Sequence, residues 1–192
     1  MPIVFSKSAL LEIDVQNDFC LHGALAITDG DGVIPPLNDT ARSFAEHGAP
    51  VIATQDWHPA KHCSFVSSGG TWPPHCVQGS QGAELHPALD KNPLSLILRK
   101  GFRPDMDSYS AFFENDRKTP TGLAGYLKSL GRETVYIGGL ATDYCVLYSA
   151  LDAVALGFRT LVFADSVRGV NIPEGSVVKA FVSMKAAGIT II

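Results

Sequence analysis

Residues 134–164 read TVYIGGLATDYCVLYSALDAVALGFRTLVFA and contain two short apolar runs with a helical pattern between them. The runs at 134–139 and 159–164 have the length and apolar character of buried strands. Between them, apolar residues recur at helical spacing over about 142–156, and Gly157 follows as a residue that tolerates the left-handed conformation closing a helix. This stretch therefore predicts a strand, a helix and a second strand in succession.

The same alternation extends over the rest of the chain. Further strand-like runs lie at 9–15, 50–54, 95–99 and 189–192. Further glycines that can close a helix are Gly48, Gly131 and Gly188. Strands that alternate with helices predict a mostly parallel sheet covered on both faces, which is a three-layer α/β fold. The 192 residues suit one such domain, 1–192, with a core that is stable without disulfides.

Composition and charge narrow the range of partners. Hydrophobic residues make up 46% and charged residues 18% of the chain, which is typical of a globular protein and not of a disordered one. The net charge of -4 gives no basic field for phosphates, so we expect no nucleic acid and no membrane as a partner. Four cysteines without CxxC spacing, and no signal peptide, predict free thiols in the cytoplasm. A homo-oligomer is compatible with the sequence, which carries no signal for it.

A long segment without strand or helix periodicity lies at about 55–94. It is rich in Pro, Gly, His and Trp. A loop of this length within a compact domain usually has a function, and ligands of open α/β sheets bind beyond the carboxyl ends of the strands. We therefore expect a metal-binding loop insertion here and a site where the loop meets the strand ends.

Three reactive side chains follow three of the predicted strands. Asp14 ends the first run, where a carboxylate removed from water needs a cation, and Lys100 closes the third run and can supply that charge. Cys145 lies in the first turn of the helix at 142–156, with Thr142 as N-cap, and a helix N-terminus beside a cation favours the nucleophilic thiolate. The alternatives are a structural ion pair and a small buried cysteine. Together the three residues predict a base, an electrostatic partner and a nucleophile.

A second cluster predicts a metal site. In Asp56-x-His58, extended backbone points both side chains the same way, and the long loop can return His75 to the same ion. Two histidines and one carboxylate suit zinc, manganese or iron(II), with positions open for water or substrate. His62 is either a further ligand or a hydrogen-bonded loop histidine that orients Asp56 or a neighbouring residue. The remaining three histidines are expected at the surface or in turns.

Three aromatic residues lie close in sequence to these polar residues. Phe19 follows Asp14, Trp72 precedes His75, and Tyr109 follows Lys100. Large rings at such points are either core filler or the walls of a slot. Because all three flank site residues, they suggest a slot for a flat ring.

Five segments carry a family resemblance. They are DVQNDF (14–19), TQDWHPAKHCSF (54–65), TWPPHC (71–76), RKGFRPDMDSYSAFF (99–113) and GGLATDYCV (138–146). These segments resemble the successive signatures of nicotinamidases, also called pyrazinamidases, within the isochorismatase-like cysteine hydrolases. The resemblance runs from about residue 9 to the C-terminus, and the pairing of Asp-x-His with Trp-x-x-His separates nicotinamidases from metal-free relatives. Gln55 and His22 depart from the family pattern without touching the proposed chemistry.

The resemblance implies a fold, an activity and a set of site residues. The fold is a six-stranded parallel sheet with helices on both faces, and the activity is hydrolysis of nicotinamide, and of pyrazinamide, in NAD salvage. The implied residues are the triad Asp14, Lys100 and Cys145, the metal ligands Asp56, His58 and His75, the ring-binding residues Phe19, Trp72, Tyr109 and Ala141, and the oxyanion donors Ala141 and Cys145 beside a cis peptide at Leu140 and Ala141. One divalent ion, with zinc preferred over manganese or iron, is the implied cofactor, and His62 and Ser64 are candidates for a fourth ligand.

The implied chemistry passes through a thioester. Asp14 takes the thiol proton of Cys145, Lys100 favours the thiolate, and the sulfur attacks the carboxamide carbon. Backbone amides hold the oxyanion, ammonia leaves, and water hydrolyses the thioester. The two rival hypotheses are another hydrolase of the same fold, acting on isochorismate, a carbamoyl or a ureido group, and a non-enzymatic module that stores metal or senses oxidants through Cys145.

Overall fold

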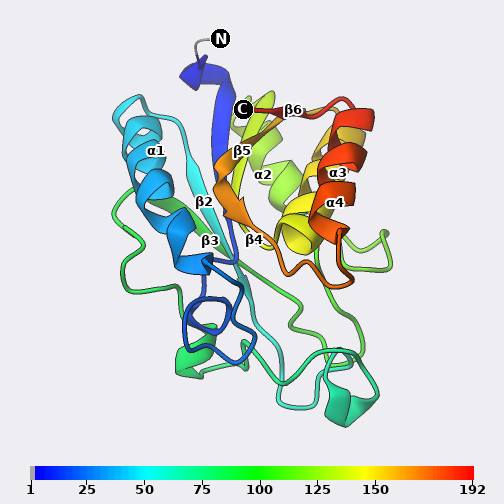
Figure 1. Ribbon diagram of the computed structural model, residues 1–192. Coiled ribbons are helices and arrows are strands. Elements are labelled where there is room, and N and C mark those ends of the chain that lie inside the picture. Colours follow the sequence, from blue (N-terminus) through cyan, green and yellow to red (C-terminus); the bar gives the residue numbers. More distant parts are fainter. Residues whose placement is uncertain (1–2) are drawn as a thin grey trace.

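The computed structural model describes residues 3–192, which form a six-stranded sheet between two layers of helices (Figure 1). The strands are β1 (Ser8–Ile13), β2 (Val51–Asp56), β3 (Leu94–Lys100), β4 (Thr134–Leu140), β5 (Arg159–Arg168) and β6 (Thr190–Ile191). Their order across the sheet is β3-β2-β1-β4-β5-β6, and every neighbouring pair is parallel. The predicted three-layer α/β/α fold with a parallel sheet is confirmed.

The helices divide unequally between the two faces of the sheet. They are α1 (Ile34–Glu46), α2 (Leu123–Ser129), α3 (Leu147–Ala155) and α4 (Ser176–Ala186). Helix α1 covers one face, and the other three cover the opposite face (Figure 1). Each helix is followed by the predicted glycine in a left-handed conformation, for example Gly48 at φ 67° and Gly188 at φ 85°.

The expectation that every strand is buried is wrong for β3. This strand pairs only with β2, so it forms an edge of the sheet, and its residues before the buried Lys100 alternate between partly buried and exposed. Ile97 at its centre is 46% exposed. By contrast β1 lies between β2 and β4, and all six of its residues are buried. The apolar run at 95–99 was therefore a poor guide to burial, because an edge strand lacks a neighbour on one side.

The expected helix at 142–156 begins differently from the prediction. Residues Thr142–Val146 form a π-helical turn, η6, before α3 begins, and the residue at the N-cap is Ala141. No side chain caps this turn, so the assignment of Thr142 as the N-cap is wrong. Thr142 is instead almost fully buried, at 1% exposure.

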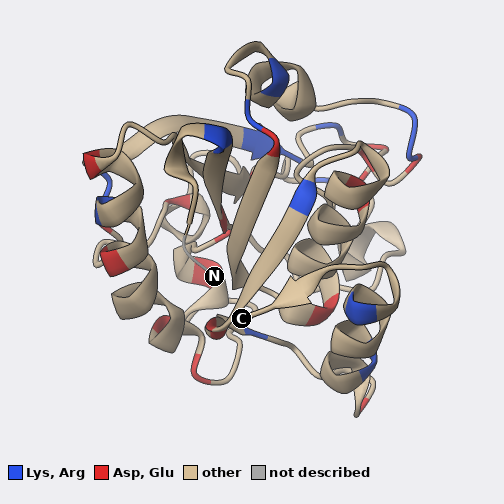
Figure 2. Ribbon diagram, turned by 90° about the horizontal axis from the view of Figure 1, so that it is seen from above, with Lys and Arg blue, Asp and Glu red and all other residues tan. Residues whose placement is uncertain are grey.

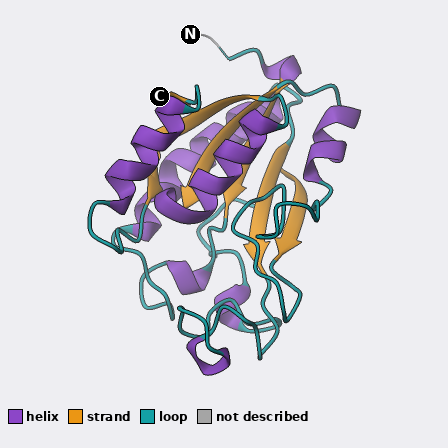
Figure 3. Ribbon diagram, turned by 90° about the vertical axis from the view of Figure 1, so that its right-hand side faces the viewer, coloured by secondary structure: helices purple, strands orange, loops and turns teal. Residues whose placement is uncertain are grey.

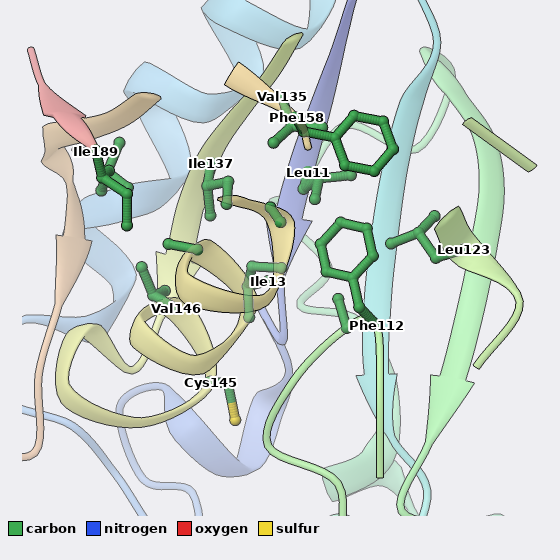
Figure 4. Packing of buried hydrophobic residues seen from close by; sticks show 14 of the residues in the cluster. Leu11, Ile13, Phe112, Leu123, Val135, Ile137, Cys145, Val146, Phe158 and Ile189 are labelled. Carbon is green, nitrogen blue, oxygen red and sulfur yellow. The ribbon is translucent and has the colours of Figure 1, made fainter. Parts of the chain in front are cut away.

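The larger core lies between the sheet and the three helices α2, α3 and α4. Figure 4 shows Leu11 of β1 and Ile137 of β4 packing near Phe112 and Phe158, with Val146 beneath them. Cys145 belongs to the same cluster, but its sulfur points away from the apolar side chains (Figure 4). The core thus fixes the backbone of η6 and leaves the thiol facing the carboxyl ends of the strands.

The carboxyl ends of the strands meet two long connections. Residues 57–93, with the short 3-10 helices η4 (Val66–Ser68) and η5 (Gln81–Ala83), and residues 101–122 gather beyond this edge of the sheet (Figure 3). The strand order reverses between β1 and β4, which is where parallel sheets open a crevice for ligands. A site is therefore expected between the ends of β1 and β4.

Charged residues of both signs are interspersed over the helices and loops in the view of Figure 2. Among the described residues, none of the helices combines the length and the apolar character needed to cross a bilayer.

Candidate active site

Lys100 is the centre of a buried polar cluster at the carboxyl end of β3. Its Nζ lies 2.8 Å from Oδ2 of Asp14 and 2.5 Å from Oδ1 of Asp56, and it donates to the carbonyl oxygen of Ser108 at 2.8 Å. Sγ of Cys145 is 3.5 Å away. Burial alone would lower the pKa of Lys100, but the two carboxylates raise it well above the ordinary value. The ammonium therefore stays charged within the protein interior.

Asp14 follows β1 directly and is fully buried. Its Oδ1 accepts a hydrogen bond of 2.6 Å from the hydroxyl of Thr54, and that hydroxyl oxygen in turn accepts from the Asp14 amide at 3.0 Å. Burial raises the pKa of Asp14 to about 6, against the opposing effect of Lys100. A carboxylate with this affinity for protons is a better base than an ordinary aspartate.

Cys145 presents its thiol to these two residues. The residue is 6% exposed, and its sulfur lies within 4.8 Å of carboxylate oxygens of Asp14 and Asp56. The sequence predicted that the helix start and Lys100 favour the thiolate, and the other surroundings of Cys145 oppose this effect. Burial, together with Asp14 and Asp56, raises the pKa of Cys145 well above its ordinary value despite the neighbouring Lys100. The resting group is therefore a thiol, and a base has to remove its proton as the sulfur attacks.

The backbone before Cys145 has the feature that the family resemblance implied. The peptide bond between Leu140 and Ala141 is cis. Ala141 is 7% exposed and lines the same pocket as Cys145. The two residues whose amides were expected to hold an oxyanion thus lie together at the end of β4.

Asp56, His58 and His75 come together as one possible metal-binding group. Their ligand atoms all lie within 4.8 Å of one another, and Oδ2 of Asp56 is 3.6 Å from Nε2 of His58. Nδ1 of His58 lies 2.8 Å from the carbonyl oxygen of Gly101, and Nδ1 of His75 lies 2.7 Å from that of Pro73. Because a carbonyl only accepts, both Nδ1 atoms carry a proton, so in the neutral ring each Nε2 can offer its lone pair to an ion. The donor set and its tautomers fit a divalent metal.

His62 has both ring nitrogens engaged within the loop. Nδ1 lies 2.7 Å from the hydroxyl of Ser64, and Nε2 lies 3.2 Å from the carbonyl oxygen of Met106. The ring stacks on His58, with 4.1 Å between centroids. These contacts support the second reading of His62, in which it orients a ligand and does not bind the ion.

A second group of potential ligands, Cys20, Asp31 and His86, lies away from the pocket. Here the tautomer is opposite, because Nδ1 of His86 accepts a hydrogen bond of 3.2 Å from the Ala88 amide. The proton therefore sits on Nε2, 3.4 Å from Oδ1 of Asp31. This arrangement is a hydrogen-bonded cluster and does not offer the lone pair that an ion needs.

The thiol and the metal-binding group open into one pocket. Its side chains surround about 380 Å³ of space not filled by atoms, part of which is open solvent. All three predicted ring-binding residues, Phe19, Trp72 and Tyr109, line it. Nε1 of Trp72 donates to the hydroxyl of Tyr109 at 3.1 Å, so two of the three rings are fixed to each other.

The pocket also contains residues that the sequence did not single out. They are Leu25, Ile27, Asp107, Tyr144 and Val170. Tyr144 lies within the GGLATDYCV segment and contacts both Trp72 and Tyr109 edge-on or tilted. Its place directly before Cys145 was a signal that could have found it. Val170 comes from the loop after β5, and nothing in its local sequence marks it.

Comparison with known proteins gives one family. The isochorismatase domain matches residues 8–192. The chain is 43% identical to nicotinamidase from Escherichia coli over 95% of this chain and 93% of that one. Pyrazinamidase from Pyrococcus horikoshii, solved in complex with zinc, is 40% identical with a TM-score of 0.87, covering 97% of this chain and 98% of that one. PnC1 from L. infantum, solved in complex with nicotinate, is 36% identical with a TM-score of 0.92, covering 100% of this chain and 95% of that one.

Proposed function

The chain belongs to the isochorismatase family, and from this premise we propose that it hydrolyses nicotinamide to nicotinate and ammonia, with pyrazinamide as a second substrate. One observation carries the proposal. A cysteine thiol beside a buried aspartate and lysine shares a single aromatic pocket with an Asp-His-His group whose tautomers leave ligand atoms free. A carboxamide attached to a ring that contains a nitrogen can offer its carbonyl carbon to the thiol and its ring nitrogen to the Asp-His-His group.

The reaction begins with a proton transfer. Asp14 accepts the thiol proton as Sγ of Cys145 attacks the carboxamide carbon, and the carbonyl oxygen becomes an oxyanion. The amides of Ala141 and Cys145 are the proposed donors to that oxyanion, an interaction worth about 3 to 4 kcal/mol per donor. Lys100 keeps its charge throughout and balances the negative charge as it moves between Asp14 and the substrate.

The second half of the reaction returns the proton. Asp14 passes it to the amide nitrogen, the carbon-nitrogen bond breaks, and ammonia leaves a thioester on Cys145. Water then attacks the thioester carbon while Asp14 accepts a proton from it. The carbon–sulfur bond breaks, the proton on Asp14 returns to Sγ of Cys145, and the product acid leaves as nicotinate with its own proton released to solvent.

The proposed cofactor is one zinc ion held by Asp56, His58 and His75, with manganese or iron(II) as alternatives. When bound, the ion supplies a Lewis acid for the ring nitrogen and so orients the amide over the thiol. The chain itself prepares this site by fixing both histidine tautomers through Gly101 and Pro73.

The two rival functions explain less of the pocket. A hydrolase of isochorismate or of a carbamoyl group has no use for the Asp-His-His group. An oxidant sensor needs an exposed thiolate, whereas Cys145 is 6% exposed and burial raises its pKa well above the ordinary value. The proposed location is the cytoplasm, and a homo-oligomeric state stays a prediction.

The test is ammonia release from nicotinamide by the purified protein, with nicotinate identified as the product. The assay is repeated after prolonged chelation and after addition of zinc. Release that depends on the metal supports the proposal. Absence of release from nicotinamide, with turnover of a carbamoyl compound, would assign the chain to the rival hydrolase.

A further inference from the structure

We propose that Val170, held in place by Asp143, limits the size of the substituent that a substrate ring can carry at its C5 position. The inference deepens the proposed function and rests on it. It concerns the lining residues of the pocket to which neither the reaction, the metal-binding group nor the stacking of the ring assigns a role. That wall includes Leu25, Ile27 and Val170.

The position of Val170 depends on a single buried carboxylate. Oδ1 of Asp143 accepts a hydrogen bond of 2.9 Å from the Val170 amide, and Oδ2 accepts one of 2.9 Å from the Asn171 amide. The hydroxyl of Ser176, the first residue of α4, also donates to Oδ2. Asp143 is 7% exposed, so these bonds to an ionised group are shielded from water and strong. Three donors on one carboxylate fix the start of the loop after β5.

Two further contacts hold the same loop against the site. The hydroxyl of Tyr144 donates to the carbonyl oxygen of Ile172 at 2.8 Å. At Gly169, a Cβ atom would lie 2.3 Å from Cγ2 of Val177 and 2.9 Å from Oδ1 of Asp143, so the backbone passes with no spare room. Val170 is therefore a fixed wall and not a flexible flap.

The geometry of the substrate identifies which ring position meets this wall. The carboxamide is on C3 and is held at Cys145, and the ring nitrogen is held at the metal-binding group. The carbon between those two anchors is C2, and C5 lies directly across the ring from it. The rings of Phe19, Trp72 and Tyr109 are assigned to the two flat faces. By elimination we assign the C5 edge to the apolar lining residues that remain, Val170 among them.

The experiment measures kcat/KM for nicotinamide and for nicotinamides that carry methyl, ethyl or phenyl at C5. Val170→Ala should raise the ratio of the substituted amides to nicotinamide by about tenfold or more, since small changes in an apolar pocket have effects of this size. Val170→Leu should lower the same ratio. Val178→Ala is the matched control, because Val178 lies on α4 and is 67% exposed.

Asp143 acts through Val170, so it is a positioning residue. Asp143→Asn keeps one acceptor oxygen but loses the charge, and it should relax the selectivity among C5 substituents while raising KM for nicotinamide more than it changes kcat. A merely structural role would lower kcat/KM for all the amides by one common factor. The proposal would be overturned if the ratio of kcat/KM for the C5-substituted amides to kcat/KM for nicotinamide is the same in Val170→Ala and Val170→Leu as in the unaltered protein. Absence of nicotinamide hydrolysis by the unaltered protein would overturn the proposed function instead, so the two failures are distinct.

Discussion

Nζ of Lys100 lies 2.5 Å from Oδ1 of Asp56, so the predicted catalytic lysine and a predicted metal ligand form one ion pair. The other carboxylate oxygen of Asp56 faces Nε2 of His58 at 3.6 Å. Asp56 therefore has one oxygen for Lys100 and one for an ion. The charge of the lysine and the charge of a metal are balanced by the same buried group.

This sharing predicts how Lys100→Met responds to zinc. The variant leaves Asp14 and Asp56 as buried carboxylates without their cation, which should lower the free energy of unfolding of the metal-free protein by about 3 to 5 kcal/mol. Zinc neutralises part of that charge, so it should raise the melting temperature of the variant more than that of the unaltered protein. Equal zinc-induced shifts in the two proteins would contradict the coupling.

A second prediction concerns the nucleophile. Cys145→Ala should lower kcat by more than about a thousandfold, because the residues of the triad act as one unit. Melting temperature and zinc content should stay near those of the unaltered protein, since Ala fits the apolar side of η6. Cys63→Ala, at a cysteine outside the pocket, is the control and should keep its activity. Activity of more than a few per cent in pure Cys145→Ala would end the assignment.

The positions of Asp14, Lys100 and Cys145 were predictable because parallel strands place their carboxyl ends at one edge of a sheet. Asp56 was predictable on the same ground, and His58 followed from the two-residue period of extended backbone. His75 depends on a long loop returning to the sheet, which periodicity alone cannot establish. The prediction that His75 binds the metal therefore depended on the family resemblance.

Other features depend on packing that the sequence does not display. The raised pKa of Cys145 results from burial beside two carboxylates from different strands, and a reading based on the helix start and one cation missed it. Val170 enters the pocket only because Asp143 binds its backbone amide across 27 positions of the chain. Ile97 looked buried because an apolar run does not reveal which strand lies at the edge.

The third prediction compares the Asp56, His58 and His75 group with the Cys20, Asp31 and His86 group. His75→Ala should lose bound zinc and raise KM for nicotinamide by about tenfold or more, because the ion positions the ring. His86→Ala should keep both zinc content and KM, because its Nδ1 accepts from a backbone amide and its Nε2 carries the proton. Elemental analysis and kinetics on the two variants check this. Zinc-free preparations with full activity would refute the metal site altogether.

The fourth prediction concerns stability and pH. Glu12 lies in β1, one residue before the end of the strand, with no exposed surface, and neither of its carboxylate oxygens has a hydrogen-bond partner among the described residues. Burial, with a smaller effect of Asp90, raises its pKa from 4.5 to about 8. Below pH 4.5 the group is protonated in both the folded and the unfolded states. As the pH rises toward 8 only the unfolded state ionises, so stability falls by about 1.4 kcal/mol per pH unit.

Glu12→Gln removes this titration. The free energy of unfolding is measured with denaturant at about pH 5.5 and pH 8. Its decrease between these two pH values should be about 3 kcal/mol smaller in the variant than in the unaltered protein. Glu46→Gln, at an exposed glutamate at the end of α1, should show the unaltered pH dependence. If Glu12→Gln keeps the original pH dependence, Glu12 is ionised in the folded state.

The last prediction concerns substrate choice and follows from two fixed points in one pocket, the thiol of Cys145 and the Asp-His-His group. Nicotinamide places its ring nitrogen meta to the carboxamide, so one molecule can engage both points. Pyrazinamide keeps a nitrogen at the same offset and should also be hydrolysed. Benzamide fills the slot without a nitrogen, and picolinamide places its nitrogen next to the carbon that bears the amide, too close to the reacting group.

Benzamide and picolinamide should therefore be poor substrates. A polar partner left unpaired in a buried site costs about 1 to 3 kcal/mol, which corresponds to a loss on the order of ten- to a hundredfold in kcat/KM. The four amides are compared side by side under saturating zinc. His75→Ala should shrink the difference between nicotinamide and benzamide, because the nitrogen then has no ion to bind. If benzamide turns over as fast as nicotinamide in the unaltered protein, the metal does not orient the ring, and the role of Asp56, His58 and His75 must be sought in the water that attacks the thioester.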